Sequence, residues 1–162
     1  MAIVNGCEFP EALLYFVERT QMVWVEVTGD EVRVGLTDPA QTRAGKILHL
    51  RIKAAGTVRE RGRPIATVES GKWAGPVMAP VGGTVVEANP EAEKDPGLLN
   101  TDPYGKGWIV RMKISNPEEL RDLFQRIELS KDMYEFRAFT RLKQLNYLKR
   151  TAQVDEDLRW RY

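Results

Sequence analysis

The alternation of apolar and polar residues predicts a chain made mostly of short β-strands. From Val23 onward, apolar residues recur at every second position, a spacing that places them on one face of a strand. Gly29-Asp30 interrupts this pattern, and strand-like residues resume over 31–36. Because a glycine-containing pair between two such runs is typical of a tight turn, residues 23–36 are predicted to form a hairpin.

Further strand-like runs follow at short, turn-bounded intervals. They cover residues 47–52, 57–59, 64–69, 75–79, 84–87 and 108–114. Regular short strands separated by glycine and proline are typical of a small sandwich or barrel. A weak internal echo relates Gly-Thr-Val-Arg-Glu at 56–60 to Gly-Thr-Val-Val-Glu at 83–87, as expected for a sandwich with two similar halves.

Helices are predicted at both ends of this β region. Pro10 and the acid that follows it stand where a helix begins, so residues 10–17 are predicted to form a short N-terminal helix. A single helical turn is expected after the capping residue Thr37.

The composition changes after residue 115. Ser115-Asn116-Pro117 is a strong helix start, and apolar residues at steps of three after Ser130 predict a long amphipathic helix. We therefore predict a β domain over residues 1–115 and a helical extension over residues 116–162 that packs on it.

The composition also excludes several classes of function. The 162 residues carry 24 Lys+Arg and 23 Asp+Glu, and a net charge of +1 gives no overall attraction for nucleic acid or an anionic membrane. One cysteine and one histidine rule out an intrachain disulfide and a Cys/His metal cluster. The chain has no long apolar run and no leader-like start. We expect a cytoplasmic protein with no membrane segment and no metal site.

Catalytic candidates are few. His49 lies inside an alternating run and is interpreted as a strand residue, and Cys7 is interpreted as a small hydrophobic residue. Ser70-Gly71-Lys72 is not the end of a phosphate-binding loop, because Trp73 replaces the required Ser or Thr. No catalytic residue is predicted.

The segment 64–83 contains the most informative feature. Two strand-like runs flank Gly71 and Lys72, so a hairpin would project the Lys72 side chain from its tip. An exposed lysine on a stiff tip suits an attachment point that a modifying enzyme can reach. The alternative is an ordinary solvated lysine in a turn, which describes most lysines.

Three segments of the chain resemble the glycine cleavage system H protein family. The family's hairpin pattern Glu-Ser-Val-Lys-Ala-Ala is matched by Glu69-Ser70-Gly71-Lys72-Trp73-Ala74. Residues 34–41 with Gly45 form the second match, and residues 100–108 form the third and most specific one. The matches follow the family's order from about Pro10 to Leu123.

This resemblance implies a barrel-sandwich hybrid fold and a lipoyl group joined by an amide to Lys72. Glu69, Ser70, Gly71 and Trp73 would form the hairpin around the attachment point. The chain would be a carrier and not itself an enzyme, and a lipoate-attaching enzyme would be one partner. Biotin is disfavoured, because biotin domains usually flank their lysine with methionines.

The departures from the family pattern indicate a particular branch. The family's His-Glu-Trp reads Met22-Val23-Trp24, and the Ser-Asp pair after the lysine reads Gly75-Pro76. We expect these changes to alter the surface around the arm. The opening residues 4–10 and the tail beyond Arg126 are most similar to the lipoate-binding proteins of the heterodisulfide-reductase-like sulfur-oxidation pathway. That resemblance implies that the arm carries sulfur-bound intermediates and electrons to a heterodisulfide-reductase-like complex.

Two other functions stay open. An ordinary H protein would carry an aminomethyl group between the decarboxylase and the aminomethyltransferase of glycine cleavage. An unmodified interaction module would leave Lys72 inert, and lipoate ligases would ignore it.

Two structural questions also have alternative answers. Trp73 either packs over the hairpin or forms an apolar ledge for the cofactor, and packing is favoured. The tail carries Arg137, Arg141, Lys143, Lys149 and Arg150 without an intervening acid. This basic stretch is either a solvated face or a docking surface for an acidic partner.

Overall fold

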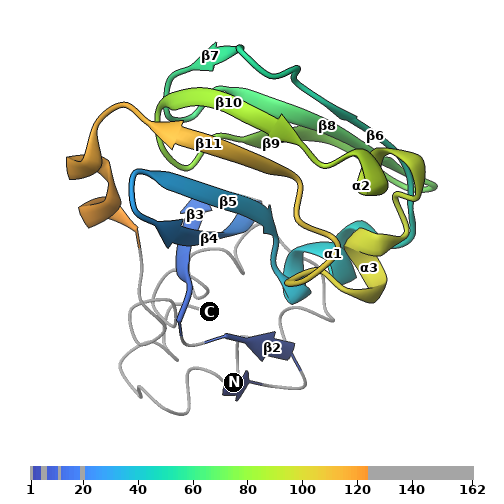
Figure 1. Ribbon diagram of the computed structural model, residues 1–162. Helices are drawn as coiled ribbons and strands as arrows, with labels where there is room; N and C mark the ends of the chain where they lie inside the picture. The colour runs from blue at the N-terminus through green and yellow to red at the C-terminus, as the bar shows by residue number, and fades with distance from the viewer. Residues whose placement is uncertain (1, 5–6, 11, 19–20, 124–162) are drawn as a thin grey trace.

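The computed structural model describes residues 2–4, 7–10, 12–18 and 21–123 (Figure 1). Its strands are β1 (Ala2–Val4), β2 (Cys7–Phe9), β3 (Leu14–Glu18), β4 (Gln21–Thr28), β5 (Glu31–Leu36), β6 (Ile47–Ile52), β7 (Val58–Arg59), β8 (Pro64–Ser70), β9 (Ala74–Met78), β10 (Gly83–Ala88) and β11 (Val110–Ile114). The helices are α1 (Asp38–Ala44), α2 (Pro90–Lys94), α3 (Leu98–Thr101) and the 3-10 helix η1 (Pro117–Asp122). The expected mainly β chain is confirmed.

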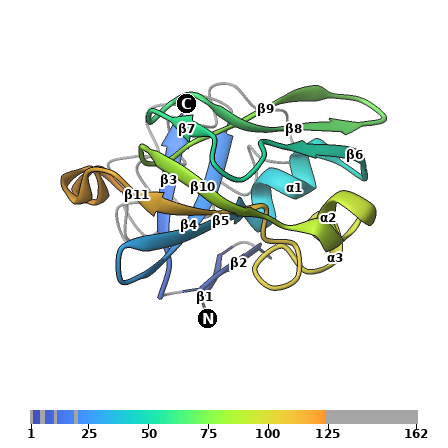
Figure 2. The same ribbon diagram turned by 45° about the horizontal axis from the view of Figure 1, so that its top comes forward.

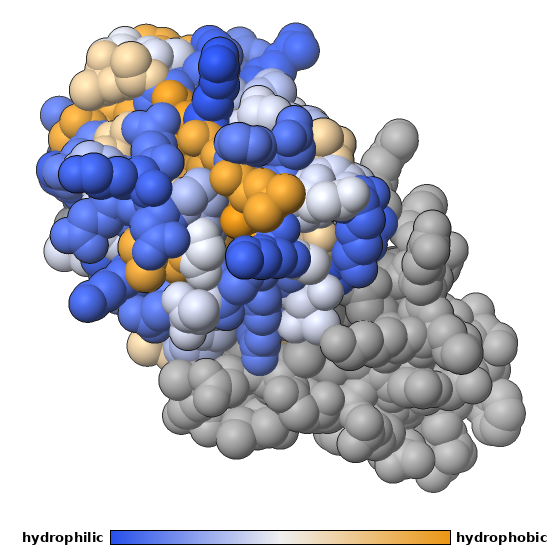
Figure 3. Space-filling model, turned by 90° about the vertical axis from the view of Figure 1, so that its right-hand side faces the viewer, coloured by the Kyte–Doolittle hydropathy of each residue, from blue (hydrophilic) through white to orange (hydrophobic). Residues whose placement is uncertain are grey.

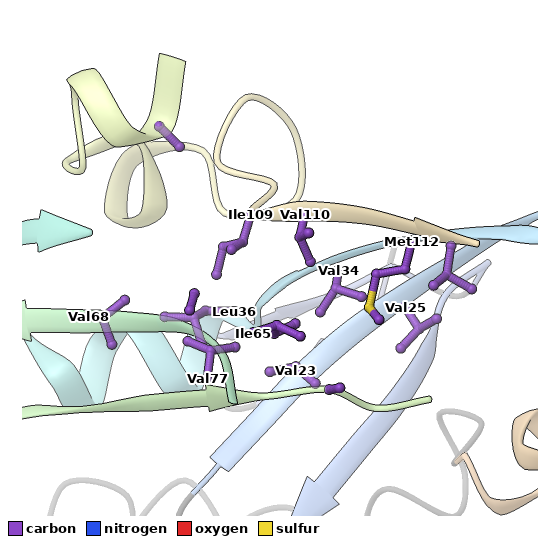
Figure 4. Packing of buried hydrophobic residues seen from close by; sticks show 14 of the residues in the cluster. Val23, Val25, Val34, Leu36, Ile65, Val68, Val77, Ile109, Val110 and Met112 are labelled. Atoms are coloured by element: carbon purple, nitrogen blue, oxygen red, sulfur yellow. The ribbon is translucent and has the colours of Figure 1, made fainter. Parts of the chain in front are cut away.

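Two antiparallel sheets enclose the main core and make the fold a barrel-sandwich hybrid. One sheet has six strands in the order β3-β4-β5-β11-β10-β7, and the other has three in the order β6-β8-β9. Figure 4 shows side chains of β8 and β9 facing those of β4, β5 and β11. Val23, Ile65 and Val77 are among the fully buried residues of this cluster. Burial of such side chains supplies about 1.5–3 kcal/mol each and fixes how the sheets face each other.

A second hydrophobic cluster lies on the opposite face of β4. Phe9, Tyr15, Met22 and Trp24 are fully buried in it. Successive side chains of a strand point to opposite faces. Strand β4 therefore contributes Val23 and Val25 to the main core, and Met22 and Trp24 to the second cluster. Strand β4 is therefore covered on both sides, and strand β2 supplies part of that cover through Phe9.

The predicted helix over residues 10–17 is wrong. Residues Leu14–Glu18 form β3, which pairs antiparallel with β4. Leu14 packs against the main core, whereas Tyr15 is buried in the second cluster, so the apolar run serves two faces with a period of two. Leu13 N–H does donate to the Pro10 carbonyl at 3.4 Å, but pairing with β4 makes the next residues a strand.

The expected hairpin over residues 23–36 is confirmed by β4 and β5, and the internal echo has a spatial counterpart. Strands β7 and β10, which carry the two similar sequences, pair antiparallel with Thr84 opposite Val58. His49 lies in β6 as expected, and Cys7 lies in β2.

The helix predicted after Thr37 is α1. The Thr37 hydroxyl accepts from Ala40 N–H at 3.3 Å and donates to the Met22 carbonyl at 3.1 Å, so it caps the helix and joins it to β4. The start predicted at Ser115-Asn116-Pro117 becomes η1, where the Asn116 side chain accepts from Glu118 N–H at 3.1 Å. Helices α2 and α3 were not expected from the sequence.

The described part of the chain ends just after η1. Leu123, the last described residue, follows η1 and is buried. The helix η1, drawn in orange, lies at the end of the molecule opposite the turn between β8 and β9 (Figures 1 and 2). The helix predicted after Ser130 and its basic stretch lie outside the described residues, so the extension over 116–162 stays a prediction beyond η1. Within the described ranges, no helix is long and apolar enough to cross a membrane.

Candidate attachment site

The hairpin of β8 and β9 ends in a tight turn over residues 70–73. The register pairs Val68 with Gly75 and Glu69 with Ala74, and Ser70 N–H then donates to the Trp73 carbonyl at 2.7 Å. Val68 and Ser70 are buried while Glu69 points outward, so the alternation of the strand continues to the turn. The turn therefore leaves Gly71 and Lys72 at the tip, as the sequence predicted.

The Ser70 hydroxyl holds this turn together. It donates to the Trp73 carbonyl at 3.2 Å and accepts from the amides of Trp73 at 3.1 Å and Lys72 at 3.4 Å. Three polar groups of the turn are thereby satisfied by one buried side chain. The predicted site residue Ser70 supports the backbone of the turn.

Lys72 is exposed at the tip. Within residues 21–123 its amine makes no ion pair, so no carboxylate in that part of the chain competes for it. Figure 3 shows the described part of the face that contains this end of the molecule as mostly hydrophilic, with hydrophobic areas in between. The arrangement offers a primary amine on a stiff support, which is what amide formation by a second enzyme requires.

Trp73 packs over the hairpin. Its ring contacts the main core, and a Cβ added to Gly75 would lie 2.5 Å from its Cζ2 atom. The ring therefore occupies the space where residue 75 would carry a side chain. Two departures from the family pattern, tryptophan after the lysine and glycine in place of serine, thus fit each other sterically, and the packing interpretation of Trp73 is supported.

Asn100 fixes the loop beside the tip. Its amide donates to the Gly45 carbonyl at 2.8 Å and to the Gln41 side chain at 3.0 Å, and its oxygen accepts from Ile47 N–H at 2.9 Å. These bonds join α3 to α1, to the loop that follows α1 and to the start of β6. The sequence indicated Asn100 only as part of a family motif, without a role.

The rest of that motif forms a loop that folds on itself. The Asp102 carbonyl accepts from the amides of Gly105 at 3.2 Å and Gly107 at 2.8 Å. A Cβ on Gly107 would lie 2.5 Å from the Leu98 carbonyl oxygen, so the turn requires glycine there. Trp24 Nε1 donates to the Pro103 carbonyl at 2.9 Å, which ties the loop to β4.

The other predicted neighbour, Glu69, faces solvent. Its carboxylate lies 3.8 Å from His49 Nε2 on the adjacent strand, and both side chains are more than half exposed. Such a pair contributes little to stability. In the described part of the chain, no group of three or more His, Cys, Asp or Glu residues could hold a metal ion.

Two departures from the family pattern do not change the surface. Met22 and Val23 are fully buried, Met22 in the second cluster and Val23 in the main core. The expectation that these positions alter the surface around the arm is therefore wrong, because β4 is covered on both faces. Gly71, by contrast, is exposed beside the lysine.

A further charged group lies on the six-stranded sheet. Arg111 of β11 contacts Glu31 of β5 at 2.7 Å and Glu87 of β10 at 3.3 Å. The hydrogen bond to Glu31 raises the pKa of Arg111 above its already high value. This group links three strands and takes no part in the site at Lys72.

Comparison with known proteins agrees with this geometry. Residues 14–136 match the family model described as Glycine cleavage H-protein. The chain is 60% identical over 125 residues to "Probable glycine cleavage system H protein 2" of Saccharolobus solfataricus, covering 76% of this chain and 84% of that protein. It is 41% identical over 153 residues to "Glycine cleavage system H protein 2" of Aquifex aeolicus, covering 94% and 92%.

A solved structure shows the same fold. The crystal structure of a glycine cleavage system H protein from Mycobacterium marinum superposes with a TM-score of 0.61 at 28% identity, covering 70% of this chain and 97% of that one. Together with the sequence matches, this places the chain in the glycine cleavage H-protein family, whose members are carriers that hold lipoate covalently on a lysine and are not themselves enzymes.

Proposed function

We propose that Lys72 is the lysine of this chain that receives lipoate. The observation that carries the proposal is the exposed Lys72 amine at the tip of a turn that buried Ser70 holds in shape. The surrounding residues fit a covalent group of this kind, because Gly71 and Lys72 have open surroundings on the solvent side and Trp73 lies back over Gly75.

The protein and the cofactor have separate tasks in this proposal. When bound, lipoate supplies a disulfide that opens and closes as a two-electron couple. The chain supplies a rigid support, an amine that forms the amide and loses its charge, and a partner surface. This division explains why one histidine and one cysteine are enough for the whole chain.

We further propose that the arm carries an aminomethyl group between the decarboxylase and the aminomethyltransferase of glycine cleavage. The family model and the named relatives support this function better than sulfur oxidation. The sulfur-oxidation hypothesis depended partly on the tail beyond Arg126. The Aquifex aeolicus H protein matches 94% of this chain, so most of that tail also occurs in a protein with the H-protein name.

Attachment is tested by coexpression with a lipoate-attaching enzyme and measurement of intact mass. We expect one lipoyl adduct on the native chain and none on Lys72→Arg, which keeps the charge and the length of the side chain. Lys53→Arg is the matched control, because Lys53 is an exposed lysine outside the hairpin turn, and it should keep the adduct. An adduct that survives Lys72→Arg contradicts the proposal.

The pathway is tested by reconstitution of the lipoylated chain with glycine decarboxylase and aminomethyltransferase. Lipoate-dependent turnover of glycine is expected. A lipoylated chain that supports no glycine turnover, but is reduced and reoxidised by a heterodisulfide-reductase-like complex, would instead establish the sulfur-oxidation function.

A further inference from the structure

The side chain of Lys72 passes directly over Gly45. A Cβ built on Gly45 would lie 3.0 Å from Lys72 Cε, 3.7 Å from Nζ and 3.9 Å from Cδ. These atoms form the outer part of the side chain, to which the cofactor would be joined. The hairpin tip and the loop between α1 and β6 thus meet at this contact, although they are distant in sequence.

The backbone of Gly45 is fixed independently of Lys72. Its φ of 80° and ψ of −163° lie in a region that only glycine occupies readily. Its N–H donates to the Gln41 carbonyl at 3.0 Å, and its carbonyl accepts from Asn100 at 2.8 Å. The loop therefore holds a glycine, which has no side chain, in a fixed position directly beneath Lys72.

Backbone conformation alone does not explain this contact. Gly29, Gly56 and Gly62 also have positive φ, and nothing lies within 4 Å of a Cβ built on any of them. Among the positive-φ glycines of the described residues, Gly45 is the one whose side-chain direction is occupied, and the three nearest atoms all belong to Lys72.

We propose that Gly45, clamped by Asn100, is a positioning residue that forms a seat for the outer methylene groups of Lys72. This inference rests on the proposed attachment of lipoate at Lys72. The seat restricts the rotamers of a long side chain, so less conformational entropy is lost when the attaching enzyme captures the amine. After attachment, the same contact sets the direction in which the arm leaves the tip.

The contact is tested first in the native chain by NMR. We expect a nuclear Overhauser effect between the Gly45 Hα and Lys72 Hε protons, and a change in the amide shifts of Gly45 and Lys46 on lipoylation. The amide of Gly56 should not move. If the Overhauser effect is missing and the amides near Gly45 stay unchanged, the seat does not exist. A native chain that receives no adduct contradicts the proposed function instead, and the Overhauser effect in the unmodified chain still decides the seat.

The functional role is tested with Gly45→Ala against Gly56→Ala. Both substitutions place alanine at a positive φ and should lower the free energy of unfolding by similar amounts. Only alanine at position 45 displaces the Lys72 side chain. We expect kcat/KM for lipoate attachment to fall about tenfold for Gly45→Ala and to stay unchanged for Gly56→Ala. Equal attachment rates in both variants would overturn the proposal. Should Gly45→Ala not fold, the NMR measurement on the native chain gives the answer.

Discussion

Residues 70–73 and residues 100–108 both match the family pattern, yet they use their side chains in opposite ways. The first segment exposes Gly71 and Lys72, and its internal support comes from Ser70. The second folds around its own backbone, contains the buried Gly107 and receives the indole N–H of Trp24. The more specific sequence motif is the one that packs, whereas the attachment point requires few residues.

The difference between the two segments has a physical reason. A modifying enzyme needs a reachable amine at a fixed place, and a two-residue tip on a hairpin supplies it. The fixed place, however, depends on contacts from elsewhere in the fold. Asn100, which opens the second segment, holds the loop beneath Lys72, so the two segments are connected through Gly45.

The largest effect is expected in the packed segment, from Gly107→Ala. The new Cβ would lie 2.5 Å from the Leu98 carbonyl oxygen and 2.7 Å from that of Asp102, and neither is a flexible side chain. We expect the free energy of unfolding to fall by about 3 kcal/mol, measured by urea denaturation. A loss below about 0.5 kcal/mol would show that the loop relaxes freely. The packed segment and the exposed tip would then not differ in how tightly they are constrained.

A smaller effect is expected from Asn100→Asp, which changes the point where the segments meet. The carboxylate can still accept from Ile47 N–H but places an acceptor against the Gly45 carbonyl and the Gln41 oxygen. We expect a loss of about 2 kcal/mol in the free energy of unfolding. The amide of Gly45 should also exchange faster with solvent, while that of Gly56 serves as the control; unchanged exchange at Gly45 would contradict the clamp.

Ser70→Ala should affect the tip with little effect elsewhere. The variant leaves the Trp73 and Lys72 amides without their side-chain acceptor, which costs about 1 kcal/mol. Amide exchange should rise at residues 71–73 and stay unchanged at residues 102–107. Increased exchange in both segments would show that the tip is not an independent unit.

Gly71→Ala is the matched partner of Gly107→Ala and should have the smallest effect. Nothing lies within 4 Å of a Cβ at residue 71, and neither glycine has positive φ. We expect a change of at most about 0.5 kcal/mol in the free energy of unfolding, with lipoate attachment preserved. A large loss at 71 would mean that the tip is as tightly constrained as the loop.

Much of the fold could be predicted from local patterns. Alternation indicated the hairpin of β4 and β5 and the strands from β6 to β11, because the period of two reflects burial on one face. The same rule was insufficient for residues 14–18. Their apolar run is compatible with a helix when considered alone. It forms β3 because it pairs with β4 and its alternate side chains are buried in two different hydrophobic clusters.

Local sequence patterns likewise predicted only part of the candidate site. Lys72 and the turn around it were identified from residues 64–83, since a hairpin tip is a local feature. The role of Asn100 could not be predicted, because its bonds reach residues more than fifty positions away in the chain. The burial of Met22 and Val23 also depended on both faces of β4 being covered.

The sequence by itself determined the strand pattern, the exposed hairpin lysine, the scarcity of reactive side chains and, through its motifs, the resemblance to a lipoyl carrier. The tertiary structure decided which residues support that lysine. It placed Gly45 under Lys72 and joined Asn100 of α3 to the Gly45 carbonyl and to Ile47 N–H. The reason is that these contacts join segments far apart in the chain, where no periodicity or spacing in the sequence records which residues will meet.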